Sequence, residues 1–523
     1  MSKIYIIFPT LLVFASSAHA QSTVSVTDGV FKTSFETLEL PGGEDMGFLG
    51  GQFLYGITPN LSIGPAAYGA ATGDRGGFIT LGGALDASVP VSERLSINAG
   101  YFLGAGGGRG GYQLSGGGLM LRSHLGLDYS LGGLGTLGIG ISNQDFPNGT
   151  INSTQPYLTY TYPFKTLIAD GWRGPTFTQT NGSSLAESEQ DFSVVFRHYD
   201  IPANVTRDNG SPQYGRIELV GAEWTNYLDD NYFVRLESEG AMGGKSNGYM
   251  QIFLGSGYRL PLSDRTALKG ALSLGVAGGG GVDTGGGVLL DAQASVQHML
   301  GDSLFVEAGA GYVQAPQAGF EALSLTGKVG YKFGSPKVEN DSVSFSELSG
   351  YSTQPLRVRA VNQTYMQAAP GWRGHHADQN VDNLGVQLDY FPTDNLYLTG
   401  QGIAAYKGDA GAYMAGLVGV GTHLPLGSSG FYLEGEGLAG AAGGGGLAVG
   451  GGLVWQANAH LGYELTDSLS LTLGVGRLEA VDGPLKADVF SAGLSYKFGV
   501  PIKKRSTSSR EFSTTWNGLQ QPV

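Results

Sequence analysis

The chain has 523 residues, carries a formal net charge of −14 and contains no cysteine. Without cysteine it has neither a disulfide framework nor an acceptor for lipid at a processed N-terminal Cys. The acidic balance also does not suit a nucleic-acid partner. We therefore expect no disulfide, no lipid anchor and no nucleic acid.

Residues 1–20 have the pattern of a secretory signal peptide. Lys3 supplies a positive start, Ile4 to Ala15 is a short apolar stretch, and Ala18-His19-Ala20 is a small-x-small cleavage site. Beyond it, no apolar run approaches the roughly 18 residues that a membrane helix needs. Only helices and closed barrels can cross a bilayer, because unpaired backbone groups are too costly in lipid. If this exported chain enters a membrane, it does so as a barrel.

Four landmarks each occur three times along the chain. A Gly-Gly-Gly triplet begins at Gly116, Gly285 and Gly450, in steps of 169 and 165 residues. The other landmarks are a Tyr-x-Phe element ending at Phe164, Phe333 and Phe498, and the single positions Asn60/Asn231/Asn395 and Pro90/Pro261/Pro425. Such self-similarity indicates that one structural unit was copied three times.

Within each copy, apolar and polar residues alternate with a period of two. In the first copy, Leu125, Leu127 and Tyr129 alternate with His124 and Asp128. Matching stretches lie at 290–297 and 455–461. Alternation over about ten residues is typical of a membrane strand with lipid on one side and a polar interior on the other.

Each copy divides into eight such segments, joined alternately by short turns and longer loops. Thr58-Pro59-Asn60 is a short turn, whereas 201–215 and 368–383 are long and polar. This layout resembles the OmpA/OmpX-type eight-stranded outer-membrane β-barrels, here internally triplicated. It divides the chain into a signal peptide (1–20), repeat one (21–164), a linker (165–190), repeat two (191–333), a linker (334–355), repeat three (356–498) and a polar tail (499–523).

We predict an all-β fold, a transmembrane antiparallel β-barrel of about 24 strands in three eight-stranded repeats. The strands could form three tandem barrels or one large barrel. The linkers and the repeated Tyr-x-Phe ends favour separate barrels. The small, mostly uncharged residues at the inward positions favour one large barrel, because a narrow barrel lined by them would be underfilled. Of the two arrangements, we slightly favour the single large barrel.

The last strand of repeat three carries a candidate insertion signal. Ser491, Gly493, Tyr496 and Phe498 fit the polar-x-Gly-x-x-aromatic-x-aromatic pattern of terminal strands that the outer-membrane assembly machinery recognises. The 25 residues that follow Phe498 depart from that pattern, since most such proteins end there. We expect outer-membrane lipid and this machinery as partners, and the cell outer membrane of a Gram-negative-type envelope as the location.

The favoured function is a porin-like passive channel, and a structural or adhesive protein made of closed tandem barrels that display surface loops is the alternative. Catalytic, cofactor and metal sites are not expected. In a channel, inward polar residues would shape the field that a solute meets. The expected lumen-lining residues are Arg122, His124, Asp128, Arg235, Glu237, Glu239, Asp291, Gln293, Gln456 and Asn458.

Four further features stand out in the sequence. The Gly-rich segments 104–118, 275–287 and 435–452 are either contact faces for loops or neighbouring barrels, or tolerated drift. His375-His376 is interpreted as a solvated loop rather than a metal site. Aromatic residues near the first short turn of each copy predict an interfacial girdle. A repeated Gly-Trp-Arg-Gly, at 171–174 and 371–374, has no assigned role.

Overall fold

The computed structural model describes residues 24–169, 185–338, 343, 345–367, 371–373 and 380–503. Within these residues the fold is all-β, with twenty-four antiparallel strands and three single-turn helices. The expected fold class is confirmed. The signal peptide, most of the polar tail and His375-His376 lie outside the described residues.

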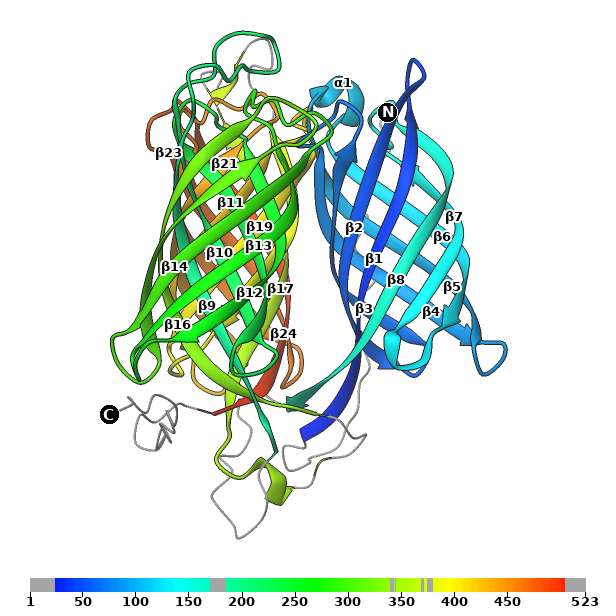
Figure 1. The fold of residues 1–523 in the computed structure, drawn as a ribbon. Helices are drawn as coiled ribbons and strands as arrows, with labels where there is room; N and C mark the ends of the chain where they lie inside the picture. Colours follow the sequence, from blue (N-terminus) through cyan, green and yellow to red (C-terminus); the bar gives the residue numbers. More distant parts are fainter. Residues whose placement is uncertain are drawn as a thin grey trace, which may run out of the picture.

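The strands form three groups of eight that follow one another along the chain (Figure 1). The first group is β1 (Val24–Leu40), β2 (Glu44–Thr58), β3 (Leu61–Thr72), β4 (Ile79–Pro90), β5 (Leu95–Gly107), β6 (Leu119–Ser130), β7 (Thr136–Asp145) and β8 (Asn152–Ala169). The second is β9 (Glu187–Asp200), β10 (Arg216–Tyr227), β11 (Tyr232–Gly243), β12 (Met250–Pro261), β13 (Thr266–Gly278), β14 (Val288–Met299), β15 (Leu304–Gln314) and β16 (Glu321–Pro336). The third is β17 (Ser352–Gln367), β18 (Val381–Tyr390), β19 (Leu396–Lys407), β20 (Met414–Pro425), β21 (Phe431–Gly443), β22 (Leu453–Glu464), β23 (Leu469–Ala480) and β24 (Lys486–Ile502). The helices are α1 (Gly111–Ser115), η1 (Gly132–Leu134) and η2 (Phe345–Leu348).

Each group closes on itself, so the chain forms three barrels. β1 pairs with β8, β9 with β16, and β17 with β24, each along most of its length. Between the first and third groups, β8 and β24 share one paired position, Ala169 with Gly499. The slight preference for one large barrel is therefore wrong, and the separate closure that the linkers favoured is correct. The terms barrel 1, barrel 2 and barrel 3 are used below for β1–β8, β9–β16 and β17–β24.

The preference for one large barrel was wrong because many inward side chains are large enough to fill a narrow barrel. Among the largest fully buried side chains are Arg122, Arg197, Arg357, Arg359 and several tyrosines. Eight strands enclose an interior just wide enough to be filled by side chains. Long cations and tyrosines fill the space that the Ser, Thr, Gly and Ala positions leave.

The period-two alternation sets the two faces of every barrel. Outward leucines are exposed, for example Leu125 at 61%, Leu272 at 69% and Leu473 at 68%. Their inward neighbours are buried and polar. The expected repeat ends, at residues 164, 333 and 498, lie inside β8, β16 and β24, which continue to Ala169, Pro336 and Ile502.

The barrels stand side by side with a cyclic order of contacts. The third strand of each barrel lies against the fifth strand of the next: β3 against β13, β11 against β21, and β19 against β5. These three contacts lie toward the end that carries the longer loops, whereas the ends of β8, β16 and β24 meet at the other end, near the described linker residues (Figure 1). This arrangement has the order of a three-membered ring built from one chain.

Candidate functional site

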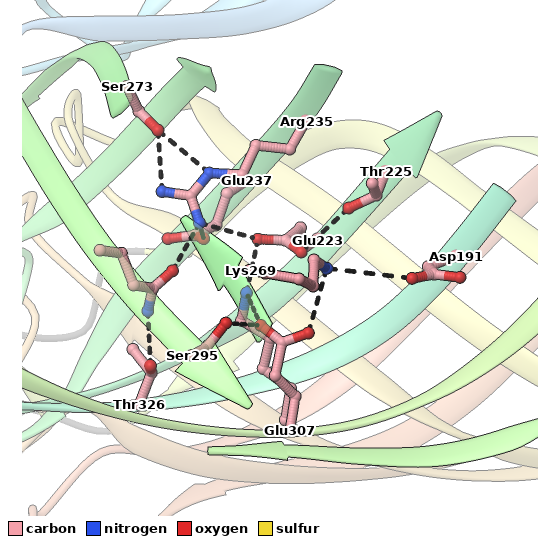
Figure 2. A network of polar contacts seen from close by, with 12 residues as sticks. Asp191, Glu223, Thr225, Arg235, Glu237, Lys269, Ser273, Ser295, Glu307 and Thr326 are labelled. Carbon is pink, nitrogen blue, oxygen red and sulfur yellow. Dashed lines mark hydrogen bonds and ion pairs between the residues drawn. The ribbon is translucent and has the colours of Figure 1, made fainter. Parts of the chain in front are cut away.

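The interior of barrel 2 is occupied by a network of buried ion pairs, part of which is drawn in Figure 2. Arg235 contacts Glu223 at 3.4 Å and Asp291 at 2.5 Å. Lys328 contacts the same Glu223 at 2.8 Å and Glu307 at 3.1 Å. These side chains are at most 3% exposed. Buried charges are tolerated when they are paired and hydrogen-bonded, and here Glu223, Asp291 and Glu307 each contact two cations.

Little space remains inside this network. A cavity of only about 10 Å³ lies among the side chains around Arg235 and Lys269. That volume holds about one water molecule. The paired side chains around this cavity therefore leave little room for a solute at the level of the network.

Barrel 1 contains a smaller network of the same kind. Lys32 lies 2.7 Å from Asp86, and Arg122 lies 2.8 Å from Glu36. The His124 ring lies 3.2 Å from Asp86 and 2.9 Å from the Arg122 guanidinium, so it links the two pairs. The Arg122 guanidinium also lies 5.4 Å from the centre of the Tyr68 ring, within cation–π range.

Barrel 3 also contains a network of buried ion pairs, and two of its arginines lie on the first strand, β17. Arg357 contacts Asp389 at 2.7 Å and Glu434 at 2.5 Å, and Arg359 contacts Glu434 at 2.8 Å. His423 completes the cluster at 2.9 Å from Glu434. Each barrel thus carries at least one buried cation on its first strand, namely Lys32, Arg197 or Arg357, and that cation pairs with an acid on another strand.

The structure places all ten expected lumen residues inside a barrel, but in three separate interiors. Nine are buried, and the side chain of His124 is 5% exposed. Barrel 1 holds Arg122, His124 and Asp128; barrel 2 holds Arg235, Glu237, Glu239, Asp291 and Gln293; barrel 3 holds Gln456 and Asn458. They do not line one shared lumen, because each barrel closes on itself.

The cations of the first strands were not predicted from the sequence, although the three acids that contact Arg197, namely Glu237, Glu239 and Asp291, were expected to face inward. Lys32, Arg197, Arg357 and Arg359 are each at most 2% exposed. A signal was present, since Phe31, Thr33 and Phe35 alternate with Lys32, Ser34 and Glu36. Following that period-two pattern through the first strand of each copy would have placed these charges inside.

A plug of apolar side chains closes each interior at the loop end. In barrel 1, Phe78, Phe146 and Ile151 come from loops and pack against inward residues such as Phe48. The corresponding loop residues are Val282 and Phe320 in barrel 2, and Leu447, Val449 and Leu485 in barrel 3. Water does not readily fill such an apolar layer. Ion pairs and an apolar plug therefore block each barrel in series.

The three Gly-Gly-Gly triplets lie where the barrels meet. Gly76 donates its N–H to the Gly285 carbonyl at 2.8 Å, and Gly411 donates to the Gly116 carbonyl at 3.1 Å. The third acceptor, the Gly450 carbonyl, receives the Asn247 side-chain amide. In all three contacts, the loop between the third and fourth strands of one barrel binds the first glycine of a triplet on the next.

The last glycine of each triplet permits a close approach of two backbones. A Cβ at Gly287 would lie 2.3 Å from the Ala70 oxygen, and one at Gly452 would lie 2.1 Å from the Ala241 oxygen. Gly118 has the same relation to the Ala405 oxygen, at 2.2 Å. All three glycines also have φ near +100°, which L side chains rarely adopt. Of the two interpretations of the Gly-rich segments, the barrel contact is correct.

Two other expectations concern the aromatic girdle and the insertion signal. Near the first short turns, Tyr232 is 57% exposed, but Tyr227, Phe233 and Tyr397 are at most 3% exposed and point into barrels. The predicted girdle therefore holds only for part of that set. The four residues of the insertion signal, Ser491, Gly493, Tyr496 and Phe498, lie on β24, which pairs with β17 and β23.

Neither a metal centre nor a membrane-spanning helix is found among the described residues. No group of three or more His, Asp or Glu side chains in this part of the chain is placed to hold a metal ion. No helix among the same residues is long and apolar enough to cross a membrane.

Comparison with known proteins gives limited information. No family model and no curated protein matches the chain. Among solved structures, OpdQ of Pseudomonas aeruginosa is 12% identical, with 92% of this chain and 98% of that one covered at a TM-score of 0.20. The outer membrane protein OpdK of the same organism is 12% identical, with 91% and 99% covered at 0.22. Its siderophore receptor PirA is 10% identical, with 92% and 81% covered at 0.26. TM-scores this low carry no argument about function.

Proposed function

We propose that this protein is an outer-membrane β-barrel protein of a Gram-negative-type envelope, and that it consists of three copies of an OmpA/OmpX-type unit. The exposed leucines of the outward faces support a lipid environment, because a continuous apolar band on a closed barrel is what a bilayer covers. The polar, paired interiors are the other half of that pattern. Outer-membrane lipid and the assembly machinery are its proposed partners.

We further propose a structural or surface-display role as its activity. The observation that carries this proposal is the double block in each barrel, namely buried ion pairs and an apolar plug. A barrel closed in this way stabilises its loops but offers no path to a solute. Joined by the Gly triplets, the three barrels form one platform whose long loops leave from the same end.

Planar bilayer recording of the refolded mature protein tests this role. We expect silence at high protein incorporation, since each interior is blocked twice in series. Incorporation is checked separately by resistance of the strands to added protease. Large, steady conductance steps from the inserted protein would contradict the display role.

Passive, porin-like conduction is a second candidate, and one observation favours it. Glu223, Glu307 and Asp291 each contact two cations in barrel 2. Shared partners let ion pairs exchange without leaving a charge unpaired, and such exchange would open a transient polar path. This candidate predicts small, flickering steps that disappear when barrel 2 is made more apolar by Arg235→Met with Asp291→Leu. Steps unchanged by that pair would exclude conduction through barrel 2.

A further inference from the structure

The contact between barrels 2 and 3 contains a cavity of about 220 Å³ at the loop end of the molecule. Five loops, three from barrel 2 and two from barrel 3, contribute to its wall. The lining residues are Arg207, Lys245, Asn247, Gly280, Gly281, Arg373 and Gly444. Three of them are cationic and none is acidic.

Backbone carbonyl groups and an aromatic ring, rather than acids, contact the three cationic residues. Arg207 donates a side-chain N–H to the Gly280 carbonyl at 2.9 Å. The backbone N–H of Arg373 donates to the Gly446 carbonyl at 2.8 Å, which fixes this loop of barrel 3. The Lys245 ammonium lies 4.8 Å from the centre of the Tyr214 ring. Within the described residues, none of the three side chains forms an ion pair.

Cations at the other two contacts between barrels have acidic partners. Arg75, in the corresponding loop of barrel 1, donates to Glu44 at 2.7 Å. Lys407, in barrel 3, lies 3.6 Å from Asp382. Arg109, where barrels 1 and 2 meet, lies 4.0 Å from Asp208, the neighbour of Arg207 in the sequence. The positive charge beside barrel 3 is therefore a local feature and not a property of every contact.

The repeat itself shows that Lys245 replaces an acid. Phe78, Tyr249 and Tyr413 accept the same backbone hydrogen bond in the three barrels. Counting four residues back from each gives Asp74, Lys245 and Asp409. Lys245 and Asp409 share a left-handed backbone, with φ of 61° and 55°. The fold thus accepts aspartate at this loop position, and barrel 2 alone presents a cation there.

We infer that this cavity is a binding site for a phosphate group. Arg guanidinium groups bind phosphate oxygens through paired N–H donors, and a lysine adds a point charge. Desolvation lowers the pKa of the Arg373 guanidinium, the direction expected where no anion compensates the charge. The cavity is large enough for a phosphate group together with part of the molecule that carries it.

The phosphate could be free or belong to a lipid headgroup, and the two sources share this chemistry. The lipid source rests on the proposed membrane location, because the loop end would then lie near the headgroups of the outer leaflet. The free source does not depend on that location. Binding of inorganic phosphate alone therefore remains a test of the site if the membrane proposal fails.

The experiment measures binding to the refolded mature protein in a zwitterionic detergent. Inorganic phosphate is titrated by calorimetry, and phosphatidic acid dispersed in the same detergent is titrated in parallel. We expect saturable binding that weakens as salt is raised. Tighter binding of phosphatidic acid would assign the lipid source, and equal or weaker binding would assign free phosphate. No saturable binding of either probe would overturn the proposal.

Two variants and a control locate the binding. Lys245→Asp introduces the residue that the other repeats carry, so it should fold, and Arg373→Ala removes the cation from barrel 3. Each should weaken binding at least about tenfold, the loss expected for one charged hydrogen bond. Lys407→Ala, at the end of β19, is the control and should leave affinity unchanged. If both variants bound phosphate as tightly as the parent, or if the control lost as much affinity as they did, the proposed site would be wrong.

Discussion

Substitution of Gly452 by alanine should loosen the contact between barrels 2 and 3. The new Cβ would lie 2.1 Å from the Ala241 oxygen, and the obstacle is backbone that cannot rotate away. A left-handed conformation costs alanine about 1–2 kcal/mol, and overpacking adds about 1–3 kcal/mol. The docked state should therefore lose about 2–5 kcal/mol, while both barrels keep their own hydrogen bonds.

Spin labels on the two barrels measure that loosening. The chain has no cysteine, so Leu272→Cys in barrel 2 and Leu473→Cys in barrel 3 can be labelled without a background signal. Both positions face outward. The parent should give a narrow distribution of distances between labels, and Gly452→Ala a broad one.

Gly42→Ala provides the matched control. Gly42 has φ of +92°, and a Cβ there meets nothing within 4 Å. This variant carries the backbone strain of Gly452→Ala without the clash, and its distance distribution should stay narrow. A narrow distribution in Gly452→Ala, or equal broadening in both variants, would refute the close-approach explanation.

Two further predictions follow from closure and from the buried charges. Arg235→Met should lower the free energy of unfolding by about 3 kcal/mol, because Glu223 and Asp291 each lose one of two buried cationic partners. A urea titration measures this free energy, and a decrease below about 1 kcal/mol would contradict the prediction. Tyr331→Ala with Phe333→Ala in β16 should reduce membrane assembly as much as the equivalent pair in β24, since each barrel closes by its own last strand. Sensitivity of the chain to protease measures assembly, and normal assembly of the β16 variant would contradict the prediction.

The sequence was sufficient to predict the strands and their two faces. Period-two alternation is local, so residues such as Leu125 and Asp128 could be assigned to opposite faces without knowledge of strand neighbours. The eight-strand unit followed from the recurrence of turns and loops. These inferences required only patterns within one copy and their repetition.

Closure could not be predicted from the same patterns. Whether β8 pairs with β1 or with β9 leaves the alternation of β8 unchanged, so the filling of the interior had to decide. That filling depends on long side chains such as Arg197 and Arg359, whose role was not recognised. Their acidic partners include Asp291 and Glu434, which lie on strands that are not their neighbours in the sheet and are more than 70 residues away in the sequence.

The sequence predicted only part of the candidate site, because contacts between barrels leave no local pattern. The triplet at Gly285 was visible as a landmark, and a contact between barrels was one of its two interpretations. The partner of Gly285 is Gly76, more than one repeat away. No local pattern connects these two residues, and only the arrangement of the barrels brings them together.

Cross-linking between the first and last strands of each group tests the account most directly. Phe35 lies opposite Leu158, Val194 opposite Val329, and Val358 opposite Tyr496. Opposed residues place their Cβ atoms about 4.5–5.5 Å apart, within reach of a short thiol cross-linker. Separately closed barrels predict an intramolecular cross-link for every cysteine pair in the inserted protein. In a single ring β1 would neighbour β24 instead, so inserted protein with reactive cysteines but no cross-link would contradict the three-barrel structure.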